Sequence, residues 1–150
     1  MYTYPYPRPM VTVDIIVLRR GSRGTEILLI QRANEPFRGC WAFPGGFVDE
    51  NEDLEAAAYR ELREETGLTG LTLMQCRAVG TPGRDPRGHT ISVVYVAKCL
   101  AGQRDAVAGD DAAALGWFPL HTLPDLAFDH ADILNQIDKR TLEEDPDESE

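Results

Sequence analysis

Eight acidic side chains crowd the segment 45–68, GGFVDENEDLEAAAYRELREETGL, and only two arginines oppose them. Glu61, Glu64 and Glu65 are spaced i, i+3 and i+4, so a helix would place them on one face. Like charges at this spacing destabilise a helix by about a few tenths of a kcal/mol per pair, and more near the negative end of its dipole. Several carboxylates on one face suit hard Mg²⁺ or Mn²⁺. We predict that a divalent cation compensates this charge. Spacing alone leaves a solvated acidic face as the alternative.

Two other ion-binding motifs fail on individual residues. An EF-hand loop could begin at Asp49, but Leu54 and Arg60 stand where its glycine and final glutamate are required. The segment GRDPRGHT (83–90) has glycines at P-loop spacing, but His89 replaces the lysine and a strand pattern follows. Neither a calcium loop nor a P-loop is therefore expected.

The acidic segment resembles the signature of the Nudix hydrolases: a glycine, five residues, a glutamate, seven residues, then R-E-U-x-E-E-x-G-U with U aliphatic. This chain fills every fixed position, with Gly46, Glu52, Arg60, Glu61, Leu62, Glu64, Glu65, Gly67 and Leu68. The resemblance implies an α/β fold, the Nudix-type α/β/α sandwich with a mixed central sheet. It also implies hydrolysis of a nucleoside diphosphate linked to a further group X.

The resemblance further implies a role for each residue of the signature. The implied metal ligands are the carbonyl of Gly46 and the side chains of Glu61, Glu64 and Glu65. Glu52 would support the catalytic glutamates, and Arg60 would fix a glutamate by a salt bridge. Mg²⁺, with Mn²⁺ as a substitute, would neutralise the diphosphate and lower the pKa of a bound water that attacks phosphorus. A carboxylate would take the proton, and which one is left open.

Outside this segment, residues 10–140 resemble the ADP-ribose pyrophosphatase branch of the family through NEPFRGCWAFPGGFVD, GRDPRGHTISVVY, AGDDAAALGWFPL and LAFDHADIL. The implied reaction converts ADP-ribose to AMP and ribose 5-phosphate. The alternatives are a pyrophosphatase for damaged deoxynucleoside triphosphates and a non-catalytic ADP-ribose sensor. The candidate substrate contacts are Arg32, Arg84, Asp85, Arg87 and Phe128.

Several of these residues have a second interpretation. Arg84 and Arg87 could grip phosphate or a terminal ribose through paired donors, or form salt bridges with Asp85 inside their loop. Asp129 at the start of the last predicted helix is either a helix cap or a ligand contact.

Four further positions carry open alternatives. Phe37 and Trp41 could stack on adenine, although core packing is favoured. Asp110 or Asp111 could add a carboxylate to the metal site or simply form a turn.

The hydropathy pattern predicts the elements that position these residues. Strands are expected at 10–18, 26–33, 71–80, 90–100 and 114–120, and helices at 54–66 and 128–142. Asp53 is a good helix N-cap, and Gly67 sits where a C-terminal glycine belongs. Residues 1–142 are expected to form one domain, followed by an acidic, disordered tail at 143–150.

Composition restricts the partners. The 150 residues carry a net charge of −10, and six of the acids lie in the tail, so a nucleic-acid-binding surface is not expected. No apolar run is long enough to span a bilayer, and the N-terminus lacks a signal-peptide pattern. Three scattered cysteines indicate reduced thiols in the cytoplasm, with buried packing roles favoured. A homodimer is expected, with the proline-rich arm and its Tyr2, Tyr4 and Tyr6 crossing to the partner.

Overall fold

The computed structural model describes residues 1–100, 109, 112–137 and 139–143. Its strands are β1 (Met10–Gly21), β2 (Gly24–Arg32), β3 (Trp41–Ala42), β4 (Gly45–Phe47), β5 (Met74–Val79), β6 (Thr90–Cys99) and β7 (Ala112–Pro119). Its helices are α1 (Leu54–Thr66), α2 (His130–Gln136) and α3 (Lys139–Glu143).

Strand β1 is the centre of one mixed sheet with the order β3-β2-β1-β6-β5. It runs parallel to β6 from the pair Met10–Thr90 to the pair Arg19–Cys99. Its other edge is shared: β2 pairs antiparallel with β1 from Leu18 onwards, and β4 pairs antiparallel with Thr12–Asp14. The sheet therefore divides on this edge close to Asp14.

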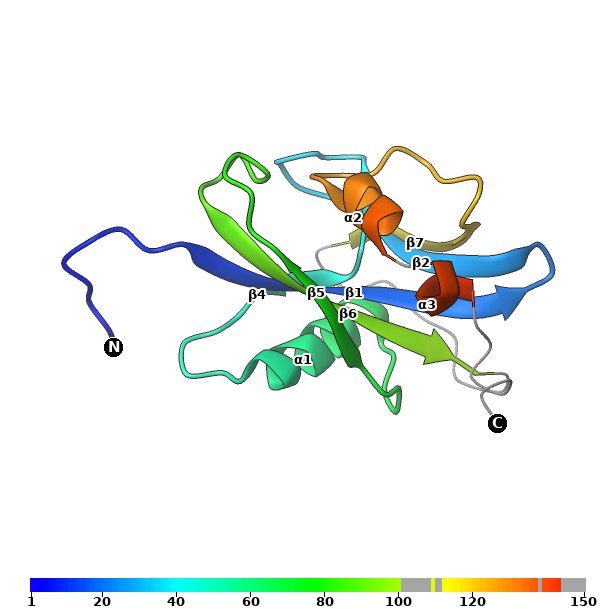
Figure 1. The fold of residues 1–150 in the computed structure, drawn as a ribbon, viewed down its shortest axis with the longest axis horizontal. Helices are drawn as coiled ribbons and strands as arrows, with labels where there is room; N and C mark the ends of the chain where they lie inside the picture. Colours follow the sequence, from blue (N-terminus) through cyan, green and yellow to red (C-terminus); the bar gives the residue numbers. More distant parts are fainter. Residues whose placement is uncertain (101–108, 110–111, 138, 144–150) are drawn as a thin grey trace.

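Each face of the sheet carries its own apolar core. One face packs on α1 through Ala57, Ala58 and Leu62, and the other packs on α2 through Ile133 and Leu134. Figure 1 shows α1 on one side of the sheet and α2 on the other. The predicted α/β/α sandwich with a mixed central sheet is confirmed.

Helix α1 occupies the predicted residues with the predicted ends. The Asp53 side chain accepts a hydrogen bond from the Glu55 backbone N–H at 3.2 Å. Gly67 adopts the left-handed conformation (φ 74°), and its N–H donates to the Arg63 carbonyl. These two caps define the ends of the helix that carries the acidic face.

The last predicted helix, 128–142, is wrong as a continuous element. Phe128 has a φ of 53°, which an α-helix does not accept, and Ile137 is extended (φ −84°, ψ 137°). Two short helices, α2 and α3, therefore replace it. The predicted strand at 71–80 also begins later, at Met74, and the preceding Leu71 and Leu73 are buried in the core on the α1 side.

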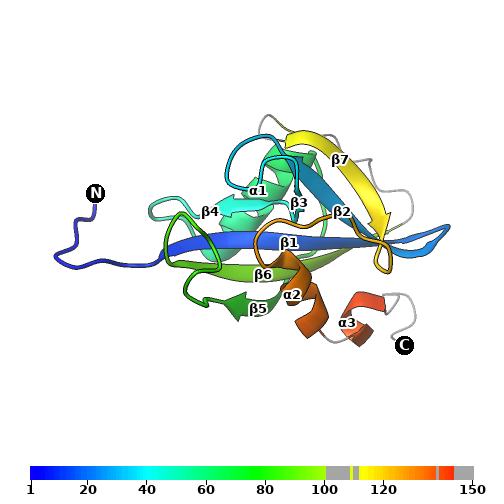
Figure 2. The same cartoon turned by 90° about the horizontal axis from the view of Figure 1, so that it is seen from above.

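Four smaller expectations concern the cysteines, the N-terminal arm, membrane spans and the acidic tail. Cys40 and Cys99 are half-buried and pack against core clusters, as predicted for the cysteines, whereas the prediction is wrong for Cys76, which is exposed on β5. Residues 1–9 form the expected extended arm, which projects away from the sheet (Figure 2). In the described part of the chain, no helix is long and apolar enough to cross a membrane. Of the predicted tail, residues 144–150 lie outside the described residues.

Candidate active site

The acidic face of α1 meets the β4 strand through two glycines that admit no side chain. A Cβ atom on Gly46 would lie 2.7 Å from the Glu61 carboxylate, and one on Gly45 would lie 2.2 Å from the Val13 carbonyl. The Gly45 N–H donates to Glu65 at 3.3 Å. The glycines therefore let the strand lie directly against the carboxylates of α1.

Arg60 is the hub of the acidic cluster. It donates to Glu52 through Nε (2.6 Å) and Nη2 (2.9 Å), and to the Phe47 carbonyl. Its Nη1 donates to Glu61 at 2.8 Å and to Glu64 at 3.1 Å. The salt-bridge role expected for Arg60 is thus observed, and the charge repulsion on α1 is relieved by an arginine within the chain.

This network shifts the ionisation of two glutamates in opposite directions. Hydrogen bonds from Arg60 lower the pKa of Glu52 to about 2. Burial raises the pKa of Glu61, against the opposing effect of Arg60. Glu61 is therefore the carboxylate that would gain most from a further positive charge beside it.

The metal ligands implied by the signature are only partly assembled. Glu61, Glu65 and Gly46 line one pocket, whereas Glu64 and Glu52 stand outside its lining and connect to it through Arg60. Within the described ranges, no three acidic, histidine or cysteine side chains converge closely enough to hold a metal ion. The donors still fit a hard divalent cation by their chemistry: they are carboxylates, one of them half-buried with a raised pKa, beside a glycine that has no side chain to cover its backbone.

The opposite wall of this pocket is basic, and each arginine is held by a partner. Arg84 binds Asp129 through two hydrogen bonds of 2.9 and 2.7 Å. Arg87 binds the buried carboxylate of Asp85, with its closest contact at 2.8 Å. Arg32 donates to a backbone carbonyl in the adjacent loop, and burial followed by the nearby Arg87 lowers its pKa.

These pairs decide between the two interpretations given to the loop residues. Asp85 bonds Arg87 through side chain and backbone, so the alternative of an internal salt bridge is the one observed for that pair. Asp129 occupies the residue before α2 but makes no capping bond, because its carboxylate binds Arg84. Both arginines still line the pocket, together with Glu61 and Glu65.

Aromatic rings close one side of the pocket. Phe128, held at a positive φ, contacts Phe37 with ring centroids 4.9 Å apart, and the Arg32 guanidinium lies 5.0 Å over its ring. Non-glycine residues in this conformation carry local strain, which is common at functional sites. Trp41 instead packs edge-on against Phe118 at 4.8 Å, so core packing is the correct interpretation for Trp41.

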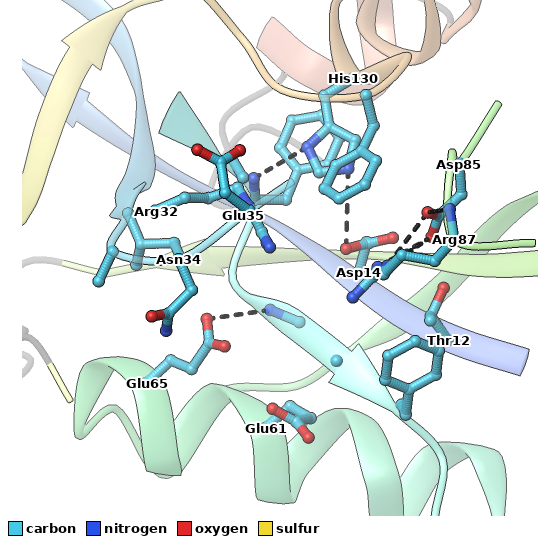
Figure 3. A pocket seen from close by; sticks show the side chains of 18 of the residues that line it. Thr12, Asp14, Arg32, Asn34, Glu35, Glu61, Glu65, Asp85, Arg87 and His130 are labelled. Carbon is cyan, nitrogen blue, oxygen red and sulfur yellow. Dashed lines mark hydrogen bonds and ion pairs between the residues drawn. The ribbon is translucent and has the colours of Figure 1, made fainter. Parts of the chain in front are cut away.

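Two buried ionisable residues of the pocket, Asp14 on β1 and His130 at the start of α2, were not among the predicted site residues. Both are buried, and they approach each other with 3.8 Å between His130 Nε2 and Asp14 Oδ1 (Figure 3). The signal for Asp14 was present, since a charged residue interrupts the apolar strand VTVDIIV. His130 gave no such signal, because its partners are distant in sequence. Asp110 and Asp111 lie outside the described residues.

The pocket as a whole encloses about 430 Å³, within the range of small-molecule sites, roughly 300–1,000 Å³. It sets carboxylates on one wall against guanidinium groups on the other, in a sandwich whose sheet divides at the pocket floor. Such a site suits an anionic ligand that bridges the two walls. These features define a protein that binds a phosphate-bearing small molecule.

The chain belongs to the Nudix family: the NUDIX domain model matches residues 8–137. It is 45% identical over 129 residues to an ADP-ribose pyrophosphatase of Methanocaldococcus jannaschii, covering 86% of this chain and 73% of that protein. It is 39% identical over 137 residues to an ADPR responsive transcriptional repressor, NtrR, of Acinetobacter baylyi, covering 87% of this chain and 54% of the repressor.

A solved structure shares the fold closely. The NUDIX domain of Shewanella oneidensis NrtR, complexed with ADP ribose, superposes with a TM-score of 0.81 at 32% identity, over 89% of this chain and 90% of that one. With every position of the signature filled, the chain is a Nudix pyrophosphohydrolase.

Proposed function

We propose that this protein hydrolyses ADP-ribose to AMP and ribose 5-phosphate with Mg²⁺. The observation that carries the proposal is the single pocket in which Glu61 and Glu65 face Arg32, Arg84 and Arg87. A diphosphate needs a cation on one side and fixed donors on the other, and this pocket offers both. The similarity to the archaeal ADP-ribose pyrophosphatase supports the choice of substrate.

The carboxylates would hold the metal ion. Glu61, Glu64, Glu65 and the Gly46 carbonyl would be the ligands, and Mg²⁺, or Mn²⁺ in its place, would supply a bound water of lowered pKa for attack on phosphorus. The Glu64 carboxylate accepts the Arg60 hydrogen bond through Oε2, so its other oxygen would be the one that binds the metal ion. Glu52 would keep Arg60 in place, and one carboxylate of the cluster would accept the proton.

The basic wall would bind and orient the rest of the substrate. Arg84 and Arg87 are each held by an aspartate, so their free N–H groups are already oriented when the diphosphate arrives. Asp85 therefore acts on the substrate through Arg87. Phe128 offers a ring face beside Arg32 for a base or sugar.

A second candidate is a sensor that binds ADP-ribose without turnover. The similarity to the ADPR responsive repressor and to the NrtR domain favours it. A third is a pyrophosphatase for damaged deoxynucleoside triphosphates, which would leave donors in the basic wall without the second sugar that they suit.

Product analysis separates the three. The protein is incubated with ADP-ribose, NADH, diadenosine polyphosphates and 8-oxo-dGTP, with Mg²⁺ or with EDTA, and the products are resolved by ion-pair chromatography. We expect AMP and ribose 5-phosphate from ADP-ribose with Mg²⁺ only. Pyrophosphate release from 8-oxo-dGTP with a kcat/KM tenfold above that of ADP-ribose would overturn the substrate assignment. Calorimetric binding of ADP-ribose without any turnover would establish the sensor.

The metal is tested separately by melting. A cation that binds only the native cluster stabilises it by about 2.7 kcal/mol at a hundred times its Kd. We expect Mg²⁺ and Mn²⁺ each to raise the Tm of the wild type and to leave a Glu61→Gln/Glu65→Gln variant nearly unchanged. Equal shifts in both proteins would place the cation elsewhere.

We further propose that the protein acts in the cytoplasm as a homodimer. The supporting feature is the arm at residues 1–9, where Tyr2, Tyr4 and Tyr6 are exposed and the Arg8 guanidinium lies 3.6 Å over the Tyr4 ring. An exposed aromatic arm suits docking on a second copy. Light scattering at micromolar concentration should give a dimer for the full chain and a monomer after deletion of residues 1–8.

A further inference from the structure

A polar island interrupts one face of the sheet. Side chains alternate along β1 and β6, and the face that carries Ile16 is apolar over most of its area. At the start of both strands the same face turns polar, with Thr12 and Asp14 on β1 and Thr90 and Ser92 on β6, all four buried. Buried polar groups are costly without partners, so this island needs hydrogen bonds.

Asp14 has one satisfied oxygen and one open oxygen. The Ser92 hydroxyl donates to Oδ2, whereas Oδ1 accepts no hydrogen bond from any residue that the structure describes. Among the described residues, no buried side-chain oxygen or nitrogen lacks a hydrogen-bond partner, so Oδ1 must be reached from the pocket that Asp14 lines. Within the described residues, no arginine or lysine lies within 4 Å of the Asp14 carboxylate. Arg84, which also lines the pocket, is bound to Asp129 instead.

His130 presents a donor beside this open acceptor. Its Nδ1 accepts the Phe43 backbone N–H at 3.2 Å, and its ring stacks on Phe43. Because burial keeps the imidazole neutral, the proton must be on Nε2. That Nε2–H lies 3.8 Å from Asp14 Oδ1, too far for a hydrogen bond between them.

An acceptor and a donor at this separation suit one chemical group. A hydroxyl can donate to Asp14 Oδ1 and accept from His130 Nε2–H at the same time. A phosphate oxygen would be repelled by the carboxylate, and an amino group could satisfy only the acceptor. This hydroxyl position adjoins the acidic wall, because Gly45 lies between Asp14 and Glu65: a Cβ atom on it would be 2.6 Å from Asp14 Oδ1, and its N–H donates to Glu65.

We propose that Asp14 and His130 together bind a ribose hydroxyl of the substrate and so determine specificity for a sugar beside the diphosphate. This inference rests on the proposed function, because ADP-ribose brings a ribose on each side of its diphosphate. The pair does not touch the reacting phosphorus. It selects the substrate by leaving a buried carboxylate and a buried N–H unpaired when the hydroxyl is missing.

The test pairs substrate analogues with variants. The kcat/KM is measured for ADP-ribose and for analogues that lack one hydroxyl of either ribose, in wild type and in Asp14→Leu/Ser92→Ala. This double variant removes both members of the buried hydrogen bond, which is tolerated better than removing one. We expect one analogue to lose about tenfold or more in wild type and less than about threefold in the variant.

A milder variant covers the event that the double variant does not fold. Asp14→Asn keeps the shape but replaces a charged acceptor by a neutral one, and neutral hydrogen bonds are about half as strong. The fold loss in kcat/KM for the same analogue should therefore fall to roughly the square root of its wild-type value. Equal penalties in wild type and Asp14→Asn for every analogue, or no penalty in wild type, would overturn the inference.

The outcome also distinguishes this inference from the proposed function. Wild-type protein that does not hydrolyse ADP-ribose refutes the proposed function, and calorimetric binding of ADP-ribose and the same analogues then tests the hydroxyl pair by the same criterion. Wild-type protein that hydrolyses ADP-ribose with penalties unaffected by Asp14 refutes the hydroxyl pair alone.

Discussion

Arg60 and Glu52 form a two-point ion pair, with Nε–Oε2 and Nη2–Oε1 distances of 2.6 and 2.9 Å. The other side of the same guanidinium bonds Glu61 and Glu64. Without metal, the carboxylates of α1 are thus compensated from within. A cation would join a network that is already ordered, with Arg60 setting the distance between the acids.

Replacing Arg60 tests this ordering role. Arg60→Lys keeps the charge but loses the planar two-point contact with Glu52. We expect the Mg²⁺ concentration for half-maximal activity to rise about tenfold or more, as is usual when the residues that orient metal ligands are changed. Arg63→Lys, on the same helix, is the matched control and should change it little. Identical magnesium curves for the two variants would contradict the role of Arg60.

Removing a metal carboxylate should stop catalysis without unfolding the protein. We expect Glu64→Gln and Glu65→Gln each to lower kcat by about a hundredfold or more, while the far-UV dichroism stays as in wild type. Removal of like-charge repulsion also favours the helix slightly. Full activity in both variants would remove these residues from the site.

The raised pKa of Glu61 predicts how stability depends on pH in the metal-free protein. A carboxyl group with a raised pKa in the folded state stabilises the fold below its ordinary pKa, and this contribution is lost as pH rises through the folded value. The charged form therefore weakens the fold at neutral pH. We expect Glu61→Gln to raise the Tm in EDTA at pH 7, with the gain disappearing near pH 4. A gain that grows on acidification would contradict the shift.

Gly46 should not tolerate even a methyl group. An alanine Cβ would lie 2.7 Å from the Glu61 carboxylate, which must then move. We expect Gly46→Ala to lower kcat by about tenfold or more with little loss of helix. Gly80→Ala is the control, because its nearest contact, the Ile91 side chain, is 3.3 Å away and neither residue lines the pocket. Equal activity in both variants would show that Glu61 can shift without loss.

We expect Arg87 to stabilise the fold in addition to binding the substrate. Removal of its guanidinium leaves the buried Asp85 carboxylate without its main partner, so Arg87→Ala should cost about 1–3 kcal/mol in urea unfolding. Arg87→Ala/Asp85→Ala should recover much of that stability but not the kcat/KM for ADP-ribose. Recovery of both would mean that Arg87 acts only through the loop.

The helix that carries the carboxylates could be predicted because all the residues that define it are close together in the sequence. Asp53, the apolar face and Gly67 lie within one continuous segment, and the structure has the helix between them. The same holds for β6, predicted at 90–100 and found at Thr90–Cys99. Local patterns failed at the C-terminal end, where Phe128 leaves the helical conformation to place its ring over the pocket.

The pocket floor could not be predicted in this way, because its contacts join distant segments. Asp14 accepts a hydrogen bond from Ser92, 78 positions later, and the Phe43 N–H donates to His130, 87 positions later. A charged residue within an apolar strand indicates that a partner exists but does not say which residue it is. The arginine wall shows the same limit, since the partner of Arg84 is 45 positions away.

The parallel pairing of β1 with β6 also orders events during synthesis. β1, β2, β4 and α1 leave the ribosome before β6, so the glutamates and Arg60 can meet while one edge of β1 is still unpaired. That open edge is a template for any other extended chain until Thr90–Cys99 arrives to cover it. The acidic cluster can therefore form before the pocket floor, and in the interval between them one edge of β1 is open to misassembly.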